Sequence, residues 1–290
     1  MFLQQLINGL VLGSTYALIA LGYTMVYGII ELINFAHGEI YMFGAFVGMI
    51  LVTVYQFPFF LAFFIAMALA SLLGITVEFL AYRPLRRSTR LAALISAIGA
   101  SIFLQNLALL IMGARPYTFP SPFAPMVYKT SLVTISRVEL IILIVSFLLM
   151  LGLTFLIQKT KIGIAMRATA QDKDTASLMG ININKVITIT FAVGSALGAA
   201  AGVMVGIYFR TVTPMMGLMP GLKGFVAAVL GGIGSIPGAM LGGLLLGVAE
   251  VMGAAYISSQ YRDAVAFAIL IIVLLFKPSG LIGKSLQVKV

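Results

Sequence analysis

The segment 31–39 places three ionisable side chains, an amide and a glycine between two long apolar stretches, and its sequence is ELINFAHGE. Asn34, His37 and Glu39 carry hydrogen-bonding or proton-exchanging groups that could contact a polar solute. A short interfacial turn is one interpretation, because loops collect polar residues. A broken helix beside a transport pathway is the other, because irregular backbone occurs at membrane depth where it lines a cavity.

A second interruption, at 231–238, has the sequence GGIGSIPG and lies in the other half of the chain. Paired breaks in the two halves of a transporter point to its transport site, which favours the broken-helix interpretation. Glu250 lies inside a later apolar segment, where an ionisable group is a functional candidate by default. The candidates for a translocation path are therefore Asn34, His37, Glu39, Ser235, Pro237 and Glu250.

Structural explanations compete with a transport role for the charges inside apolar segments. Lys223, in the preceding short apolar run, could simply neutralise Glu250 in an ion pair. Glu78, near the inner end of the third apolar run, could extend its carboxylate to the membrane surface. The sequence leaves both alternatives open.

The longest hydrophilic interval, 159–185, has the sequence KTKIGIAMRATAQDKDTASLMGININK. Residues 167–179 are predicted to form one short helix, with Ala168, Ser177 and Leu178 available for contact and Gly180 as its C-terminal cap. A solvated connector is the alternative, because polar residues are common in loops.

Several function classes are excluded by composition. The chain has no cysteine and a single histidine, so neither a metal site nor thiolate chemistry is expected. The segment 278–285, PSGLIGKS, ends like a phosphate-binding loop but has proline at the position of its first glycine. We therefore expect no cofactor and no catalytic site. The net charge of +10 lies at the ends of apolar runs, so topology and anionic lipid explain it better than nucleic acid does.

Composition also sets the fold class, because 61% of the residues are hydrophobic and only 9% are charged. Runs of roughly 20 apolar residues, enough to span a bilayer as a helix, recur along the chain. We predict an all-α polytopic transmembrane bundle of about eight or nine crossings with broken or re-entrant segments, the uncertain region being 219–256. The predicted spans are 6–30, 40–56, 59–81, 91–113, 138–158, 186–208, 219–232, 237–256 and 263–277.

Orientation follows from the basic residues, which are retained on the cytoplasmic side of membrane proteins. One cluster comprises Arg83, Arg86, Arg87 and Arg90, a second lies in 159–185, and Lys277, Lys284 and Lys289 lie near the C-terminus. All three clusters are predicted to be cytoplasmic. The proline-containing loop 114–137 then faces outward, as does the N-terminus.

Glycines recur at strict four-residue spacing on the span after the polar block, at Gly194, Gly198, Gly202 and Gly206. Residues four apart share one helix face, and small residues let membrane helices approach closely. We favour packing within the chain over a subunit interface.

Three segments carry a family resemblance: 13–45, GSTYALIALGYTMVYGIIELINFAHGEIYMFGA; 93–106, ALISAIGASIFLQN; and 227–243, AAVLGGIGSIPGAMLGG. They resemble the LivH-type permease subunit of bacterial branched-chain amino-acid ABC importers, and the resemblance covers essentially the whole chain. The loop 114–137 matches the family pattern less clearly. The resemblance implies that 159–185 is a cytoplasmic coupling loop within a single permease domain, 1–290. Its coupling residues would be Arg167, Ala168, Asp172, Ala176 and Gly180.

The resemblance further implies a complex in the bacterial inner membrane. Its members would be this chain, a second related permease subunit, two ATP-binding subunits and a substrate-binding protein outside the membrane. The substrate would be a hydrophobic L-amino acid, whose apolar side chain suits an apolar path and whose charges could meet helix ends at the breaks. A related importer for urea or short amides and an ion-coupled secondary transporter stay open as alternatives.

Overall fold

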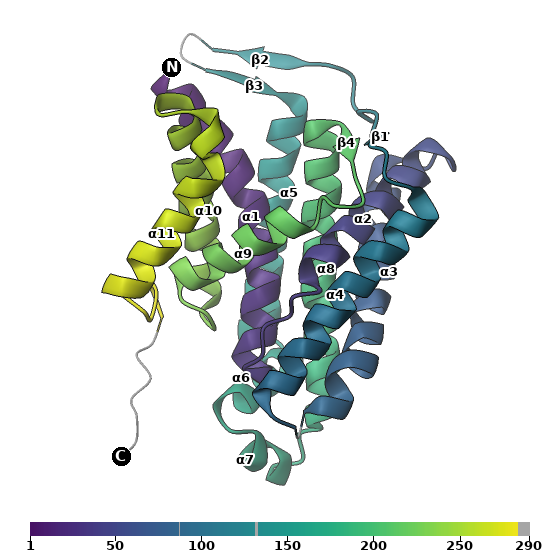
Figure 1. Cartoon of the computed structure of the whole chain (residues 1–290), viewed down its shortest axis with the longest axis vertical. Helices are drawn as coiled ribbons and strands as arrows, with labels where there is room; N and C mark the ends of the chain where they lie inside the picture. Colours follow the sequence, from purple (N-terminus) through teal and green to yellow (C-terminus); the bar gives the residue numbers. More distant parts are fainter. Residues whose placement is uncertain (87, 131–132, 284–290) are drawn as a thin grey trace.

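The computed structural model describes residues 1–86, 88–130 and 133–283, and its architecture is helical (Figure 1). Within these ranges, seven helices are long and apolar enough to cross a membrane, and His37–Thr53 and Leu218–Gly231 are shorter apolar helices. The predicted class, an all-α polytopic membrane bundle, is confirmed. Arg87, Lys284 and Lys289, which the orientation argument used, lie outside the described residues.

Each of the nine predicted apolar segments corresponds to a helix, although boundaries differ by a few residues. A π-helical turn, η1 (Glu78–Tyr82), and a 3-10 turn, η2 (Arg83–Leu85), extend the third helix, and η3 (Ser259–Tyr261) precedes the last. The apolar helices are α1 (Phe2–Ile30), α2 (His37–Thr53), α3 (Phe59–Val77), α4 (Arg90–Met112), α5 (Arg137–Lys159), α8 (Ile183–Phe209), α9 (Leu218–Gly231), α10 (Ile236–Tyr256) and α11 (Arg262–Phe276).

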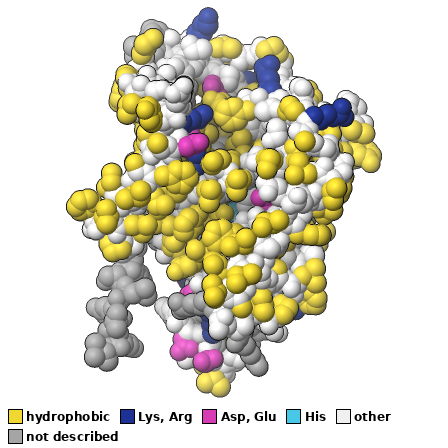
Figure 2. Space-filling view, viewed as in Figure 1, with side chains coloured by type: hydrophobic (Ala, Val, Ile, Leu, Met, Phe, Trp, Pro, Cys, Tyr) yellow, Lys and Arg dark blue, Asp and Glu magenta, His cyan; other side chains and the backbone are white. Residues whose placement is uncertain are grey.

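The centre of the bundle is formed by α1 and α8. In their most apolar stretches 94% and 72% of residues are buried, against 6% in α4 and in the span that contains α11. Helices α2, α3, α9 and α10 pack around the two central helices. Apolar side chains on α4 and α11 therefore remain available to lipid or to another subunit, and Figure 2 shows hydrophobic side chains spread over this face.

The four spaced glycines of α8 all lie at contacts within the chain. A Cβ atom on Gly202 would lie 2.0 Å from the Tyr41 carbonyl oxygen, so α2 and α8 approach closely there. Gly194 faces Gly22 of α1, Gly198 faces the His37 ring, and Gly206 faces Phe119. This glycine face thus packs the central helix against its neighbours.

The two ends of the molecule differ in content (Figure 1). At the end that holds the N-terminus, β1 (Tyr117–Thr118) pairs antiparallel with β4 (Thr211–Val212), and β2 (Val127–Lys129) pairs with β3 (Thr134–Ser136). The Gln4 amide donates to the Thr134 carbonyl over 2.8 Å, which ties the N-terminus to this end. At the opposite end lie α6 (Lys161–Gln171), α7 (Lys173–Leu178) and the α3–α4 connection.

Candidate functional site

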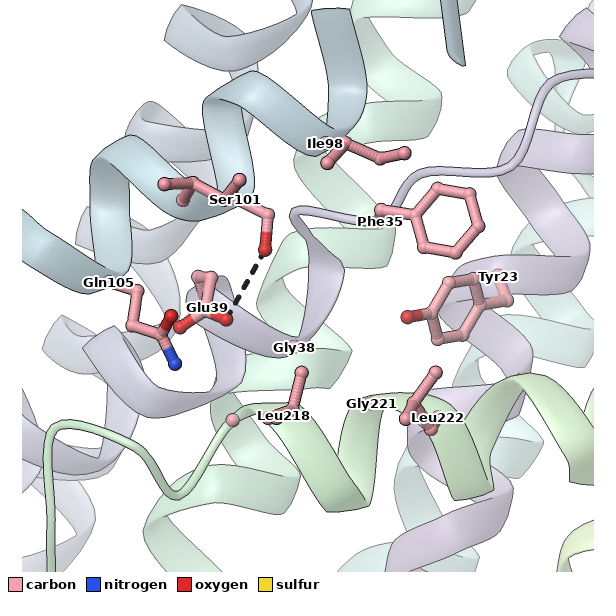
Figure 3. A pocket seen from close by; sticks show the side chains of 12 residues that line it. Tyr23, Phe35, Gly38, Glu39, Ile98, Ser101, Gln105, Leu218, Gly221 and Leu222 are labelled. Atoms are coloured by element: carbon pink, nitrogen blue, oxygen red, sulfur yellow. Dashed lines mark hydrogen bonds between the residues drawn. The ribbon is translucent and has the colours of Figure 1, made fainter. Parts of the chain in front are cut away.

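A cavity of about 190 Å³ opens where α1, α2, α4 and α9 meet (Figure 3). Tyr23 comes from α1, Glu39 from α2, and Ser101 and Gln105 from α4. The remaining wall is mostly apolar. It comprises Phe35, Gly38, Ile98, Ile102, Gly217, Leu218, Gly221 and Leu222.

Two short helices begin at this cavity, inside the bundle. Figure 1 shows the chain returning from the end of α1 to start α2 part-way along the bundle, and α9 likewise starts part-way. Their first turns touch, because a Cβ on Gly38 would lie 2.4 Å from the Gly217 carbonyl oxygen and one on Gly221 would lie 3.0 Å from the Gly38 Cα. Glycine permits this approach. Two helix N-termini, each carrying partial positive charge, therefore meet at one wall of the cavity.

Glu39 lies in the first turn of α2 and is only 2% exposed to solvent. Its Oε1 accepts a hydrogen bond from the Ser101 hydroxyl over 3.3 Å, whereas its Oε2 has no hydrogen-bond partner among the described residues. The Gln105 Nε2 is also buried and unpartnered within the described chain. No ion pair to Glu39 occurs among the residues that the structure describes. The cavity thus holds a buried carboxylate beside a free amide donor.

The irregular part of the first break is shorter than the segment singled out in the sequence. α1 ends at Ile30, Glu31 adopts a left-handed conformation with φ 62°, and α2 begins at His37. His37 is fully buried, and its ring centroid lies 4.8 Å from that of Tyr23. Asn34 is 2% exposed, and its Oδ1 accepts a hydrogen bond from the Tyr82 hydroxyl over 3.1 Å. Both residues pack beside the cavity without lining it.

Ser235 and Pro237 shape the second break. The Ser235 hydroxyl accepts a hydrogen bond from the Gly238 N–H over 3.2 Å and so caps α10, and Pro237 lies in the first turn of that helix. Proline's missing N–H is harmless in the first turn, because the first N–H groups of a helix have no partner within the helix. Gly234 approaches Gly28 of α1, because a Cβ atom on Gly28 would lie 3.4 Å from the Gly234 Cα. Neither Ser235 nor Pro237 lines the cavity.

Glu250 lies apart from the cavity, in a cluster of charges between α9, α10 and α11. Its Oε1 lies 2.9 Å from the Lys223 Nζ and 2.5 Å from the Arg262 Nε, and it accepts from the Tyr16 hydroxyl over 3.2 Å. Lys223 also pairs with Asp263 at 2.6 Å. The structure therefore contains the Lys223–Glu250 pair that the sequence offered as the structural explanation, and Arg262 reinforces it.

The polar interval 159–185 forms two helices, so the prediction of one continuous helix over 167–179 is wrong. The chain is extended at Asp172, with φ −158° and ψ 113°, and its Oδ1 accepts from the N–H groups of Asp174 and Thr175 over 2.9 and 3.0 Å. These hydrogen bonds, from Thr175 above all, lower the pKa of the Asp172 carboxyl. An ionised aspartate here caps a new helix and ends the preceding one.

The other predicted coupling residues shape the segment from within. The Arg167 guanidinium donates to the Ile157 and Gln158 carbonyls over 2.8 and 3.2 Å, and so satisfies the C-terminal end of α5. Ala168 is half-buried, Ala176 is buried, and Gly180 adopts a left-handed conformation with φ +83°. The most exposed apolar side chains of the segment are those of Leu178 and Met179, at 87% and 79%. They form an apolar tip at the end of α7.

A polar network joins the start of α8 to the α3–α4 connection. Glu78 is fully buried and pairs with Arg83 at 3.2 Å and with Arg86, so its carboxylate is neutralised inside the protein and does not reach the molecular surface. The Thr188 hydroxyl donates to Glu78 over 2.9 Å and accepts from Arg83 over 2.9 Å. From Glu78 the π-helical turn leads to Tyr82, whose hydroxyl bonds Asn34. The network thus runs from the exit of the polar segment to the break before α2.

Sequence reasoning missed Ser101, Gln105 and Tyr82. Ser101 and Gln105 are four residues apart, so they share one face of an otherwise apolar helix, and this spacing was the available signal. Tyr82 carried no such signal, because a tyrosine at the end of an apolar run is typical of any membrane interface.

Comparison with known proteins gives a full-length match. Residues 5–274 match the family described as branched-chain amino acid transport system / permease component. The high-affinity branched-chain amino acid transport system permease protein LivH of Salmonella typhimurium is 50% identical, over 98% of this chain and 96% of its own length. BraD of Pseudomonas aeruginosa, with the corresponding description, is 49% identical over the same shares. A probable LivH of Methanocaldococcus jannaschii is 26% identical over 97% and 92%.

Proposed function

The chain belongs to the family of branched-chain amino acid transport permeases, and from this membership we propose that it is a non-catalytic permease subunit of an ABC importer. It carries branched-chain, hydrophobic L-amino acids across the bacterial inner membrane into the cytoplasm. Full-length similarity to relatives named for that transport is the observation that supports the proposal most directly.

The importer assembles from this chain, a second related permease, two ATP-binding subunits and a substrate-binding protein. The segment 159–185 faces the cytoplasm, as do the described Lys277 and the C-terminus, whereas 114–137 faces the binding protein. The opposite placement of these two segments in Figure 1 supports this orientation. The basic residues beside 159–185 support it as well.

The apolar tip of α7 contacts an ATP-binding subunit. Leu178 and Met179 extend into solvent beyond a segment that is itself fixed to the bundle through Arg167 and Asp172. A small rigid element of this kind transmits the movement of a partner to the helices on either side of it. The polar network from Thr188 to Glu78, and the π-helical turn that leads from Glu78 to Tyr82 and so to Asn34, then carry that movement toward α2.

Reconstitution tests the proposed function. The proteoliposomes contain the chain, the second permease and the ATP-binding subunits, and they are supplied with loaded binding protein. They should accumulate labelled leucine only when ATP is present on the cytoplasmic side of the transporter. Uptake by the chain alone under an ion gradient would contradict the proposal and favour a secondary transporter. ATP-driven uptake of urea or a short amide without leucine would favour a related importer.

Two substitutions test the coupling role. Leu178→Glu should leave membrane insertion intact and abolish leucine uptake, because it places a charge in the apolar contact; Gln171→Glu adds the same charge at an exposed site of α6 and should transport normally. Gly180→Val should also abolish uptake, since its φ of +83° disfavours β-branched residues although a Cβ there would meet no atom within 4 Å. Normal uptake by both variants would sink the coupling assignment.

A further inference from the structure

We propose that the cavity beside Glu39 is a transient binding site for the zwitterionic head and aliphatic side chain of the transported amino acid. The proposal rests on the transport function above and names the residues that recognise the substrate. Glu39 holds the α-ammonium group, the first turns of α2 and α9 together with Gln105 face the α-carboxylate, and aliphatic side chains from α4 and α9 contact the side chain.

The negative element of the site is Glu39. A carboxylate that is 2% exposed normally has a cation or several hydrogen-bond donors, because burial of an unpaired charge is unfavourable. Glu39 has one hydroxyl donor, Ser101, and its Oε2 is unpartnered among the described residues. A primary ammonium carries three donors and a full positive charge, so it satisfies what this carboxylate lacks.

The positive element is the meeting of two helix N-termini. Gly38 and Gly221 belong to the first turns of α2 and α9, and both line the cavity. Each helix N-terminus carries about half a positive charge, and broken helices of transporters direct such ends at anionic groups of their substrates. The unpartnered Nε2 of Gln105 adds a hydrogen-bond donor to the lining of the same cavity. The site therefore offers both signs of charge within one small space.

The remaining wall suits an aliphatic side chain. Figure 3 shows Glu39, Ser101 and Gln105 gathered at one end of the cavity, with Phe35 and Tyr23 at the other and Leu218 and Leu222 along one side. The volume of about 190 Å³ is below the roughly 300–1,000 Å³ typical of drug-sized ligands, so it limits the ligand to a small molecule. Apart from the Tyr23 hydroxyl, this part of the wall offers aliphatic and aromatic contacts, which favour leucine, isoleucine or valine over polar amino acids.

A second cavity of about 280 Å³, between α3, α5 and α8, serves as the internal control. Its described lining is apolar apart from Ser71, whose hydroxyl already donates to the Met67 and Ala192 carbonyls over 2.9 Å each. The described residues of this lining include no charged side chain, and the Ser71 hydroxyl has no hydrogen left to donate. Apolar molecules can enter it, but nothing in its lining recognises a zwitterion.

Because the chain contains no cysteine, a single thiol can report on each cavity. Ser101→Cys places it in the Glu39 cavity and Ser71→Cys places it in the apolar cavity. The assembled transporter in lipid nanodiscs is treated with a small maleimide, and modification of this chain is followed by its mass over a series of leucine concentrations. Leucine should slow modification of Ser101→Cys at least several-fold and leave Ser71→Cys unchanged.

Three further measurements decide what the protection means. 3-Methylbutylamine and 4-methylpentanoate, which lack one charge of leucine each, should protect Ser101→Cys weakly or not at all. Glu39→Gln in the Ser101→Cys background should remove the protection by leucine, whereas Glu139→Gln, at a carboxylate in the first turn of α5 that does not line the cavity, should keep it. Equal protection by 4-methylpentanoate, or undiminished protection in Glu39→Gln, would overturn the proposal in favour of an apolar pocket.

The same preparations are assayed for ATP-driven leucine uptake. If the Ser101→Cys transporter takes up leucine before labelling and yet is not protected by it, the cavity proposal fails while the transport function stands. If the transporter assembled with the unsubstituted chain takes up no leucine, the proposed function itself fails.

Discussion

The regions around Glu250 and Glu39 bury the same side chain in opposite ways. Glu250 has the Lys223 ammonium at 2.9 Å and the Arg262 guanidinium at 2.5 Å, whereas Glu39 has only the Ser101 hydroxyl at 3.3 Å. Both residues are 2% exposed or less. The first region neutralises its carboxylate with cations of the chain, whereas the second gives its carboxylate one hydroxyl and the partial charge of helix N-termini and leaves room for a cation from outside the chain. A buried carboxylate is thus structural or functional according to its partners.

The largest effect is expected from breaking the neutralised region. Lys223→Met leaves the fully buried Glu250 with the Arg262 guanidinium and the Tyr16 hydroxyl, and removal of one partner of a buried ion pair costs about 3 kcal/mol of unfolding free energy. Titration of the purified chain with SDS, followed by circular dichroism, measures this change. Lys129 is an exposed residue of β2, so Lys129→Met should leave the unfolding free energy unchanged.

The double variant Lys223→Met/Glu250→Met sharpens the same test. It removes both central charges together and should recover most of the lost stability, because the remaining Arg262 and Asp263 are partly exposed to solvent. A single variant as stable as the natural protein would show that the pair does not stabilise the fold, and the contrast with Glu39 would then disappear.

The next largest effect is expected at Glu39, where substitution should reduce transport rather than stability. Glu39→Gln should leave the unfolding free energy unchanged or higher, since it removes a buried charge without a cation. Leucine uptake should fall about 10- to 100-fold, in line with the 1.5–3 kcal/mol typical of a hydrogen bond to a charged group. ATP hydrolysis stimulated by the loaded binding protein should continue, so the variant separates hydrolysis from uptake. Loss of both stability and hydrolysis would assign Glu39 to the structural class.

Sequence patterns were sufficient for the helical membrane class and for nine apolar segments, because bilayer thickness fixes the length and polarity of a span. They were also sufficient to single out Glu39 and Glu250, because charges within apolar runs are rare. They did not separate the two, since the partners of Glu39 come from α4 and those of Glu250 from α1, α9 and the start of α11. Such partners depend on which helices become neighbours.

Local chemistry explains the other differences. The break at Asp172 was missed because an aspartate inside a helical pattern is compatible both with a solvated helix face and with an N-cap, and only the N–H groups of Asp174 and Thr175 decide between them. The depth at which α2 begins was missed as well. It depends on the contact of Gly38 with Gly217, 179 residues later in the chain, which no local pattern contains.

A smaller effect is expected in the network below the cavity, where Glu78 is neutralised by two arginines. Thr188→Val keeps the shape of the side chain and removes one hydroxyl that bonds both Glu78 and Arg83, at a cost of about 1 kcal/mol. If this network transmits movement, uptake per ATP hydrolysed should fall while leucine protection of Ser101→Cys persists. Thr76→Val, whose hydroxyl bonds only its own helix, is the matched control and should behave normally.

The smallest effect is expected at Asp172, a carboxylate that is exposed and satisfied by backbone N–H groups. Its pKa is lowered in the folded chain, so the ionised cap stabilises α7 above the ordinary aspartate pKa and that contribution is lost only as pH falls through the lowered value. Leucine uptake should therefore show no dependence on this group between about pH 5 and 8. Asp172→Asn should transport nearly normally because asparagine caps helices equally well, whereas Asp172→Ala should reduce uptake by loosening α7. An Asp172→Asn variant as defective as Asp172→Ala would show that the charge itself is needed, which would move Asp172 from the satisfied carboxylates to the group that Glu39 represents.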